Sequence, residues 1–429
     1  MPARYHSVTL NKDLCRGCSD CLMHCPTQAI RVREGRAHII KELCIDCGAC
    51  IRYCSYHAKV ALTDELSIIK QYDHRVALPA PSFFAQFDRR VHSVGQILDA
   101  LKALGFDEVF EVARGADVVT RALRDLLKDR ERPRPLISSA CPAVTRIIQI
   151  RFPSLLSHIV PLRQPMEVAA AMARKSYAAR HGVKPEEVGL FFITPCPAKM
   201  TAIKSPLGHE KSNVNGAISI RDVYKAMQPL LPKYKHSETT SAATPLGLGW
   251  ALNGGESEAA LCVGSLAVDG IDNVIHVLEE LENGRLSDLD FLEASACPGG
   301  CVGGPLVFGN SFIARNTMRA ILRDMPHRDP EEEEPAWPLS PSQLLNERQL
   351  EPNTALALDE DMGAALEMMD KMRQILARLP GHDCGACGSP SCAAFAEDVA
   401  RGYYSELDCV YRLKEILETK AAGAEKKSE

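Results

Sequence analysis

Seventeen cysteines in a chain of 429 residues constrain the possible folds more strongly than any other feature of the sequence. Sixteen of them stand in local groups or directly after strand-like apolar runs. The remaining one, Cys262, lies in the apolar stretch EAALCVG, where we expect a small core residue. The first fifteen residues contain no apolar signal region and no twin-arginine signal, so we expect a cytoplasmic protein. Grouped cysteines in that reducing compartment indicate metal binding rather than disulfides.

Length and composition set the broad class of the protein. A chain of 429 residues is too long for one compact core, so we expect two or three domains. A hydrophobic content of 46% is ordinary for a globular protein, and no apolar run is long enough to span a bilayer. The formal net charge of −5 gives no sign of binding to nucleic acid or to an anionic membrane.

Residues 1–65 contain two cysteine runs with the same C-x2-C-x2-C-x3-C spacing. The runs are Cys15, Cys18, Cys21 and Cys25, and then Cys44, Cys47, Cys50 and Cys54. This spacing is typical of a ferredoxin fold with two 4Fe–4S cubes, in which the fourth cysteine of each run binds the other cube. Cluster one then takes Cys15, Cys18, Cys21 and Cys54, and cluster two takes Cys44, Cys47, Cys50 and Cys25. Zinc also binds four thiolates, but its sites usually use two pairs of cysteines.

Residues 359–418 carry a third cysteine group. Its members are Cys384, Cys387, Cys392 and Cys409, and the first three lie in a loop rich in glycine and proline. The segment resembles the small 4Fe–4S domain appended to several anaerobic electron-transfer proteins, and a zinc knuckle is the alternative. An amphipathic helix from Asp359, with a stripe of methionine and leucine, is expected to dock on a neighbouring surface. The tail at 419–429 is expected to fray.

The middle of the chain, residues 70–325, alternates strand-like runs with amphipathic stretches, which is typical of parallel α/β architecture. Residues 326–358 follow it as an acidic and proline-rich linker, with four consecutive glutamates.

Four cysteines of this middle segment stand just after strand candidates. Cys141 follows RPLISSA, Cys196 follows GLFFITP, and Cys297 and Cys301 follow FLEASA. Open α/β sheets bind ligands at the carboxyl ends of their strands, so these thiols can converge on one buried site. An isolated cysteine is usually a core residue, but four of them flanked by proline and glycine indicate a common site.

The same segments resemble the catalytic domain of FeFe hydrogenases. The family signatures TSCCP, MPCxxKxxE and ExMACxxGCxxGG are matched here by SSACP at 138–142, TPCPAKMTA at 194–202 and EASACPGGCVGG at 293–304. Further matches are GFDEVFEVARGAD at 105–117 and GLGWALNGGESEAAL at 247–261. The resemblance implies a multidomain α/β chain whose central two-lobed parallel α/β iron-hydrogenase domain lies between the ferredoxin fold and the small C-terminal 4Fe–4S domain.

By that resemblance, Cys141, Cys196, Cys297 and Cys301 hold the 4Fe–4S cube of an H-cluster. Cys301 also bridges this cube to a di-iron unit with CO, cyanide and dithiolate ligands. Lys199 matches the motif lysine that donates to an iron-bound cyanide, and a plain surface lysine is the alternative. Pro81 and Ser82, in the segment APS, are expected to supply further contacts to the di-iron ligands.

Departures from the family motifs concentrate on the expected proton path. Ala140 stands where the family has its last proton-relay cysteine, and a methyl group cannot carry a proton. Ala122 and Ala202 stand where the family has glutamates, Ser295 and Thr194 where it has methionines. The resemblance is therefore to the sensory branch of the family. Water or Ser295 stays open as another proton route.

These features predict a slow, ferredoxin-type hydrogenase that interconverts H2 with protons and electrons and reports hydrogen or redox status. Electrons would pass through three accessory 4Fe–4S clusters to a ferredoxin or flavoprotein. Maturation factors and a signalling kinase or phosphatase are the other expected partners. The alternatives are a subunit of a multi-subunit hydrogenase and an iron–sulfur assembly homologue without the di-iron site.

Overall fold

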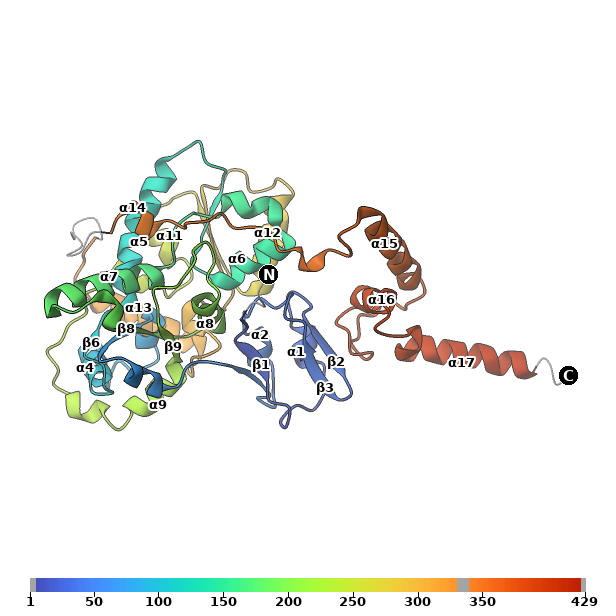
Figure 1. The fold of residues 1–429 in the computed structure, drawn as a ribbon, viewed down its shortest axis with the longest axis horizontal. Helices are drawn as coiled ribbons and strands as arrows, with labels where there is room; N and C mark the ends of the chain where they lie inside the picture. Colours follow the sequence, from blue (N-terminus) through green and yellow to red (C-terminus); the bar gives the residue numbers. More distant parts are fainter. Residues whose placement is uncertain (1–4, 330–338, 426–429) are drawn as a thin grey trace. The chain divides into compact units, whose positions relative to one another are not determined.

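The computed structural model describes residues 5–329 and 339–425 (Figure 1). It divides into two units, each built from segments distant in the sequence. Unit 1 comprises residues 1–7, 45–48 and 61–352, and unit 2 comprises residues 8–44, 49–60 and 353–429. The four consecutive glutamates of the predicted linker lie outside the described residues.

Unit 1 contains two parallel sheets, as the alternation of strand and helix patterns predicts. The first has the order β6-β5-β8-β9 and the second the order β10-β11-β7. The seven residues of β8 are all buried, because this strand lies between two others and is covered on both faces. The strands are β5 (His74–Pro79), β6 (Glu108–Val109), β7 (Leu136–Ile137), β8 (Val188–Thr194), β9 (Gly216–Ser219), β10 (Ser265–Asp269) and β11 (Phe291–Ser295).

Helices connect these strands, since a parallel pair needs a crossover. Two of the amphipathic stretches of the middle segment form α4 and α9. The helices of unit 1 are α3 (Pro81–Phe84), α4 (Val94–Lys102), α5 (Val112–Lys128), α6 (Pro142–Arg151), α7 (Pro165–His181), α8 (Pro197–Lys204), α9 (Ile220–Met227), α10 (Pro245–Gly249), α11 (Gly255–Ala259), α12 (Ile271–Glu282), α13 (Ser311–Asp324) and α14 (Pro341–Leu344). Among the described residues, no helix is long and apolar enough to cross a membrane.

Part of the predicted linker belongs to unit 1 and packs against its core instead of standing free in solvent. The backbone of Leu344 accepts a hydrogen bond from Arg163 (2.8 Å), and the backbone of Asn346 donates one to Pro161 (2.8 Å). Leu339 and Leu344 also pack against the main hydrophobic core. The linker prediction missed these contacts, because apolar residues spaced among prolines form no periodic pattern.

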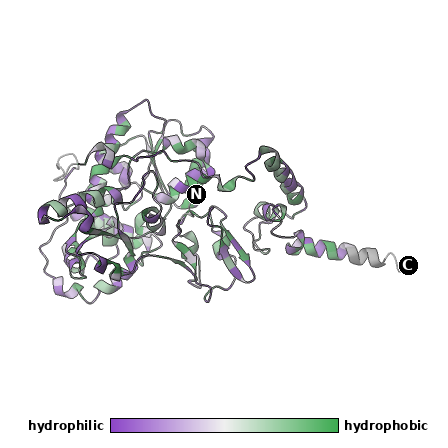
Figure 2. Ribbon diagram, in the orientation of Figure 1, coloured by the Kyte–Doolittle hydropathy of each residue, from purple (hydrophilic) through white to green (hydrophobic). Residues whose placement is uncertain are grey.

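Unit 2 contains the ferredoxin segment and the C-terminal cysteine group. Figure 2 shows hydrophilic and hydrophobic residues in the first part of α17. Its elements are β1 (Val8–Leu10), α1 (Asp20–Met23), β2 (Ile30–Arg33), β3 (Arg36–Ile39), α2 (Ala49–Arg52), β4 (Lys59–Ala61), α15 (Met362–Leu376), α16 (Cys392–Ala400) and α17 (Val410–Glu425).

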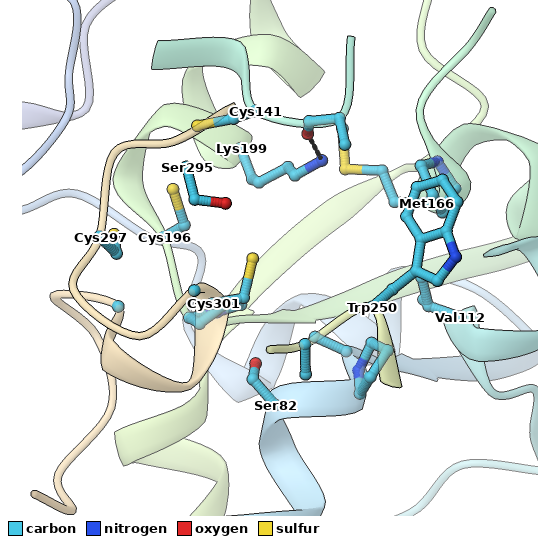
Figure 3. A pocket seen from close by; sticks show the side chains of 18 of the residues that line it. Ser82, Val112, Cys141, Met166, Cys196, Lys199, Trp250, Ser295, Cys297 and Cys301 are labelled. Atoms are coloured by element: carbon cyan, nitrogen blue, oxygen red, sulfur yellow. Dashed lines mark hydrogen bonds between the residues drawn. The ribbon is translucent and has the colours of Figure 1, made fainter. Parts of the chain in front are cut away.

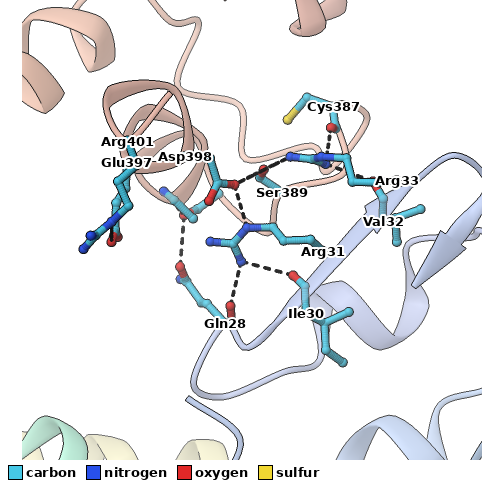
Figure 4. A network of polar contacts seen from close by, with 12 residues as sticks. Gln28, Ile30, Arg31, Val32, Arg33, Cys387, Ser389, Glu397, Asp398 and Arg401 are labelled. Carbon is cyan, nitrogen blue, oxygen red and sulfur yellow. Dashed lines mark hydrogen bonds and ion pairs between the residues drawn. The ribbon is translucent and has the colours of Figure 1, made fainter. Parts of the chain in front are cut away.

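A buried ion pair joins the ferredoxin segment to the C-terminal segment within unit 2 (Figure 4). Arg31 on β2 donates to Asp398 on α16 (2.6 Å), and both side chains are nearly inaccessible to solvent. Arg33 donates to the backbone of Cys387 (2.6 Å). The backbone amide of Val32 also donates to Gly388 (2.8 Å), so the loop carrying Cys387 extends the hydrogen bonding of β2.

The expected docking helix, α15, packs within its own segment. Ile375 and Leu379 are buried and join Phe395 of α16 in one hydrophobic cluster. Met362 and Leu366, which belong to the same predicted stripe, are exposed. The apolar stripe therefore serves mainly as an internal contact at its carboxyl end.

A candidate iron–sulfur active site at the strand ends

Two of the four isolated cysteines stand where a strand turns into a helix. Cys141 precedes Pro142, the first residue of α6, and Cys196 precedes Pro197, the first residue of α8. Proline at the first helical position loses no intrahelical hydrogen bond and has the backbone angle that the helix needs. Each cysteine is thereby held in extended backbone at the positive end of a helix dipole, which favours an anionic sulfur.

Cys297 and Cys301 lie in the glycine-rich loop after β11. Gly300 has a φ of +89°, and a Cβ there would lie 2.6 Å from a backbone nitrogen of the α10–α11 turn. A Cβ at Gly304 would lie 2.4 Å from the carbonyl oxygen of Pro195. Glycine at these positions therefore allows the loop to approach the α10–α11 turn and the turn after β8 closely.

All four cysteines line one cavity of about 910 Å³ in unit 1. Figure 3 shows the sulfurs of Cys196 and Cys301 pointing into it. The expected convergence of strand-end thiols is therefore present, although the strands belong to two different sheets. Other residues that line the cavity are Pro81, Ser82, Ala140, Met166, Lys199, Trp250, Glu256, Glu293 and Ser295.

The thiols of this site lie close together in a poorly solvated environment. Burial raises the pKa of Cys196 to about 12, and the neighbouring Cys297 and Cys141 add to the rise. Burial also raises the pKa of Cys301 to about 12, while Lys199 opposes that shift. Cys301 is exposed to the cavity that it lines. Such thiols become anionic most readily when they bind a metal, and four of them fit a cubane iron–sulfur cluster.

Lys199 lies inside the site and is not a surface residue. Its ammonium donates to the backbone oxygen of Ala140 (2.7 Å) and to the side chain of Gln164 (3.0 Å). Burial lowers its pKa, and the surrounding thiols oppose that change. A buried cation with further donor capacity beside the cavity suits an anionic ligand such as cyanide.

The surroundings of Ser82 also show whether this cavity suits an H-cluster. Its side chain is fully buried, and its hydroxyl has no hydrogen-bond partner among the described residues. It lines the same cavity as Cys301, next to Pro81. A buried hydroxyl without a partner is costly, so this oxygen is suited to a polar bound group.

The residues that depart from the family motifs have different surroundings. Ala140 and Ser295 line the cavity, whereas Ala122 and Ala202 pack against or within the main core. Thr194 is buried, and its hydroxyl accepts from the amide of Cys196 (3.1 Å) and donates to the carbonyl of that residue (3.0 Å). Thr194 therefore supports the turn that presents a cysteine.

Two buried carboxyl groups beside the cavity escaped the sequence analysis. Ser138 donates to Glu256 (2.6 Å) and accepts from the amide of Ala140 (3.1 Å). Burial raises the pKa of Glu256 to about 8, and nearby Glu293 adds to the rise. Burial also raises the pKa of Glu293, which accepts from the amides of Gly254 and Ser257 (both 2.8 Å). Both glutamates stand within motif segments quoted above, and that position was the available signal.

Two cavities in unit 2 collect the remaining cysteine groups. One of about 290 Å³ is lined by Cys15, Cys18, Cys21 and Cys54, which is the set predicted for cluster one. Another of about 340 Å³ is lined by Cys384, Cys387, Cys392 and Cys409. Cys262, by contrast, is half-buried and packs against the main core of unit 1.

The fold and these sites define a multicluster iron–sulfur protein. The family model for the iron-only hydrogenase large subunit, C-terminal domain, matches residues 73–267 and 256–305. A 4Fe-4S dicluster domain matches residues 7–55, and an iron–sulfur cluster domain matches residues 379–411. The chain belongs to the iron-only (FeFe) hydrogenase family.

Curated relatives agree with this assignment. The chain is 28% identical over 369 residues to the periplasmic Fe hydrogenase large subunit of Nitratidesulfovibrio vulgaris, covering 71% of this chain and 86% of that protein. It is 24% identical over 348 residues to the NADP-reducing hydrogenase subunit HndD of Solidesulfovibrio fructosivorans, covering 69% and 56%. It spans 45% of iron hydrogenase 1 of Clostridium pasteurianum, at 22% identity over half of this chain.

Solved structures show the same fold. An FeFe hydrogenase, HydA(deltaEFG), studied for stepwise H-cluster assembly, superposes with a TM-score of 0.55 at 17% identity, covering 67% of this chain and 98% of that one. A HydA1 variant from Chlamydomonas reinhardtii gives a TM-score of 0.54 at 17% identity, covering 65% and 94%.

Proposed function

We propose that this protein is a slow FeFe hydrogenase that senses H2 or redox state, with an H-cluster bound at Cys141, Cys196, Cys297 and Cys301. The observation that carries the proposal is the convergence of these thiols from two sheets on one cavity that also holds a buried lysine. When bound, the H-cluster supplies the metal centre at which H2 is split or formed.

The residues around the cavity bind and orient this group. Cys301 would link the cube to the di-iron unit, since its thiol faces the cavity. Lys199 and Ser82 would donate hydrogen bonds to the polar diatomic and dithiolate ligands. Apolar neighbours such as Met166 and Trp250 keep the site poorly hydrated, which strengthens each of these contacts.

The proton route would run through Glu256 in place of the missing relay cysteine. Its carboxyl lines the cavity beside Ala140, and a pKa of about 8 keeps it protonated near neutral pH. An acid with a pKa close to the working pH both donates and regains a proton readily. Glu293 lines the same cavity and can exchange protons with Glu256, while Ser138 orients the Glu256 carboxyl.

The electron route would pass through the three accessory clusters. Cys47, a predicted ligand of cluster two, packs against the same hydrophobic cluster of residues as Cys141 and Cys196. A Cβ on Gly48 would touch Pro197 and Pro305, so this loop lies against the turn after Cys196 and the end of the loop that carries Cys301. In the C-terminal cysteine group, a Cβ on Gly385 would lie within 4 Å of side chains on and just before α1, the helix that carries Cys21. The C-terminal cluster would therefore be the neighbour of cluster one.

A sensory role follows from the substituted relay positions, which favour slow turnover over metabolic flux. The signal would leave through a partner, either a ferredoxin or flavoprotein that takes electrons or a kinase or phosphatase. Maturation factors would install the di-iron unit in a reducing, cytoplasmic setting.

Infrared spectroscopy tests this function. After co-expression with the maturation factors, we expect CO and cyanide stretching bands that change under H2, together with slow H2 evolution from the same sample. Cubane-only spectra with no diatomic bands after maturation would instead favour an iron–sulfur assembly homologue.

The substitution Ala140→Cys tests the missing relay. We expect it to raise H2 evolution by about tenfold, because a thiol at this position can pass protons that a methyl group cannot. Ala140→Ser is the matched control, since its hydroxyl has a much higher pKa and should give a smaller gain. An unchanged rate in the Cys variant would show that proton delivery does not limit turnover.

A further inference from the structure

Lys59 is a buried cation beside the predicted ligands of cluster one. It lies at the start of β4 and is only 2% exposed. Its ammonium has no hydrogen-bond partner among the residues that the structure describes. The residue lines the cavity formed by Cys15, Cys18, Cys21 and Cys54. An ammonium this deeply buried is costly unless an anion lies next to it.

The internal repeat of the ferredoxin segment shows that this lysine is not required by the fold. In the first repeat the amide of Ala29 donates to the sulfur of Cys25 (3.2 Å), and in the second the amide of Ala58 donates to Cys54 (3.3 Å). The next residue is Ile30 in the first repeat and Lys59 in the second, and each is 2% exposed. Two equivalent buried positions therefore hold an apolar and a charged side chain.

Among the groups around this cavity, the cysteine sulfurs are the ones best suited to neutralise the charge of Lys59. The other charged residues lining the cavity are Arg16, which is exposed, and Asp20, whose carboxylate accepts from the Cys18 thiol (3.7 Å). Lys59 is thus the buried cation among the residues that line this cavity.

We infer that Lys59 raises the reduction potential of cluster one, so that electrons taken from H2 collect there. This inference rests on the proposed function for the source of the electrons. A cube with four thiolate ligands is anionic, and reduction adds one more negative charge, which a buried cation stabilises. Oxidation of one H2 releases two protons and two electrons. One electron reduces the cube of cluster one, and the other reduces a second accessory cube.

Redox titration of the reconstituted, cubane-only full chain, followed by electron paramagnetic resonance, tests the inference. At the midpoint potential of cluster one in the native protein, we expect Lys59→Met to lower the ratio of reduced to oxidised cube about tenfold. For a one-electron couple this corresponds to about 59 mV. The midpoints of the other two accessory cubes and of the active-site cube should change by less than threefold in the same ratio. Unchanged midpoints of all four cubes would overturn the inference.

Two further variants separate charge from structure. Lys59→Arg keeps the positive charge, so its midpoints should match those of the native protein. Lys12→Met removes an exposed lysine from the same segment and should also leave them unchanged. If Lys59→Met fails to bind its iron, Lys59→Ile, which copies the first repeat, takes its place. Because these titrations need no H2, a shifted midpoint, together with no hydrogenase activity in the matured chain, would refute the proposed function and leave the role of Lys59 intact.

Discussion

Cys301→Ala is expected to abolish H2 turnover and to remove the CO and cyanide bands from the infrared spectrum of the matured protein. The thiol of Cys301 is the one assigned to both the cube and the di-iron unit, and it faces the cavity. Changes in the residues that merely support metal ligands cost about 10–100-fold in activity or affinity, so loss of this bridging ligand should cost more than about a hundredfold. Infrared spectra and an H2-evolution assay on the same sample measure both effects.

Cys262→Ala is the matched control for this experiment. Cys262 packs against the core of unit 1 and does not line the active-site cavity. The variant should keep its diatomic bands and its turnover. Native-like bands in Cys301→Ala would contradict the assigned bridge and would place the di-iron unit elsewhere.

Glu256→Gln is expected to lower H2 evolution about a hundredfold. Glutamine keeps the size of the side chain and can still accept from Ser138, but it cannot release a proton. General acid–base groups contribute about 10²–10⁴-fold to the rates of reactions that they serve. The infrared bands of the resting H-cluster should persist, which distinguishes lost proton transfer from lost cofactor.

The control is Glu258→Gln, on the same short helix, α11. Glu258 is exposed, whereas Glu256 is buried, so this change should leave the rate within about twofold of the native value. Equal losses in the two variants would indicate damage to the helix. A native rate in Glu256→Gln would rule out the proposed proton route.

The buried carboxyl of Glu256 also makes the free energy of unfolding depend on pH. Its pKa is about 8 in the folded protein and close to 4.5 in the unfolded chain, so the folded state holds the extra proton between these values. The contribution of neutral Glu256 to the free energy of unfolding is therefore fully present below about pH 4.5 and is lost as the pH rises toward 8. Within that window the native protein should lose up to about 1.4 kcal/mol per pH unit relative to Glu256→Gln. Urea unfolding of the cubane-loaded protein at several pH values measures this difference.

The cysteine groups could be recognised without a structure because their chemistry is local. A run such as Cys15 to Cys25 wraps a cube within one loop, and the spacing alone predicts the cluster type. The strands could also be predicted, since β5, β8 and β11 are largely apolar runs that end in proline, threonine and serine. The parallel sheets follow from the alternation of strands and helices. The rule that sites form at strand ends predicts that Cys141, Cys196 and Cys301 converge, but it does not predict that they come from two sheets.

Only the tertiary structure brought together groups that no local pattern connects. Ser138 and Glu256 are 118 positions apart, and their hydrogen bond depends on how α11 packs beside the end of β7. The burial of Lys59 beside four cysteines likewise depends on how the two ferredoxin repeats face each other. Covalent spacing determines which side chains can share a small cluster, but burial sets the charge and proton affinity of their neighbours, and burial is a property of the folded chain.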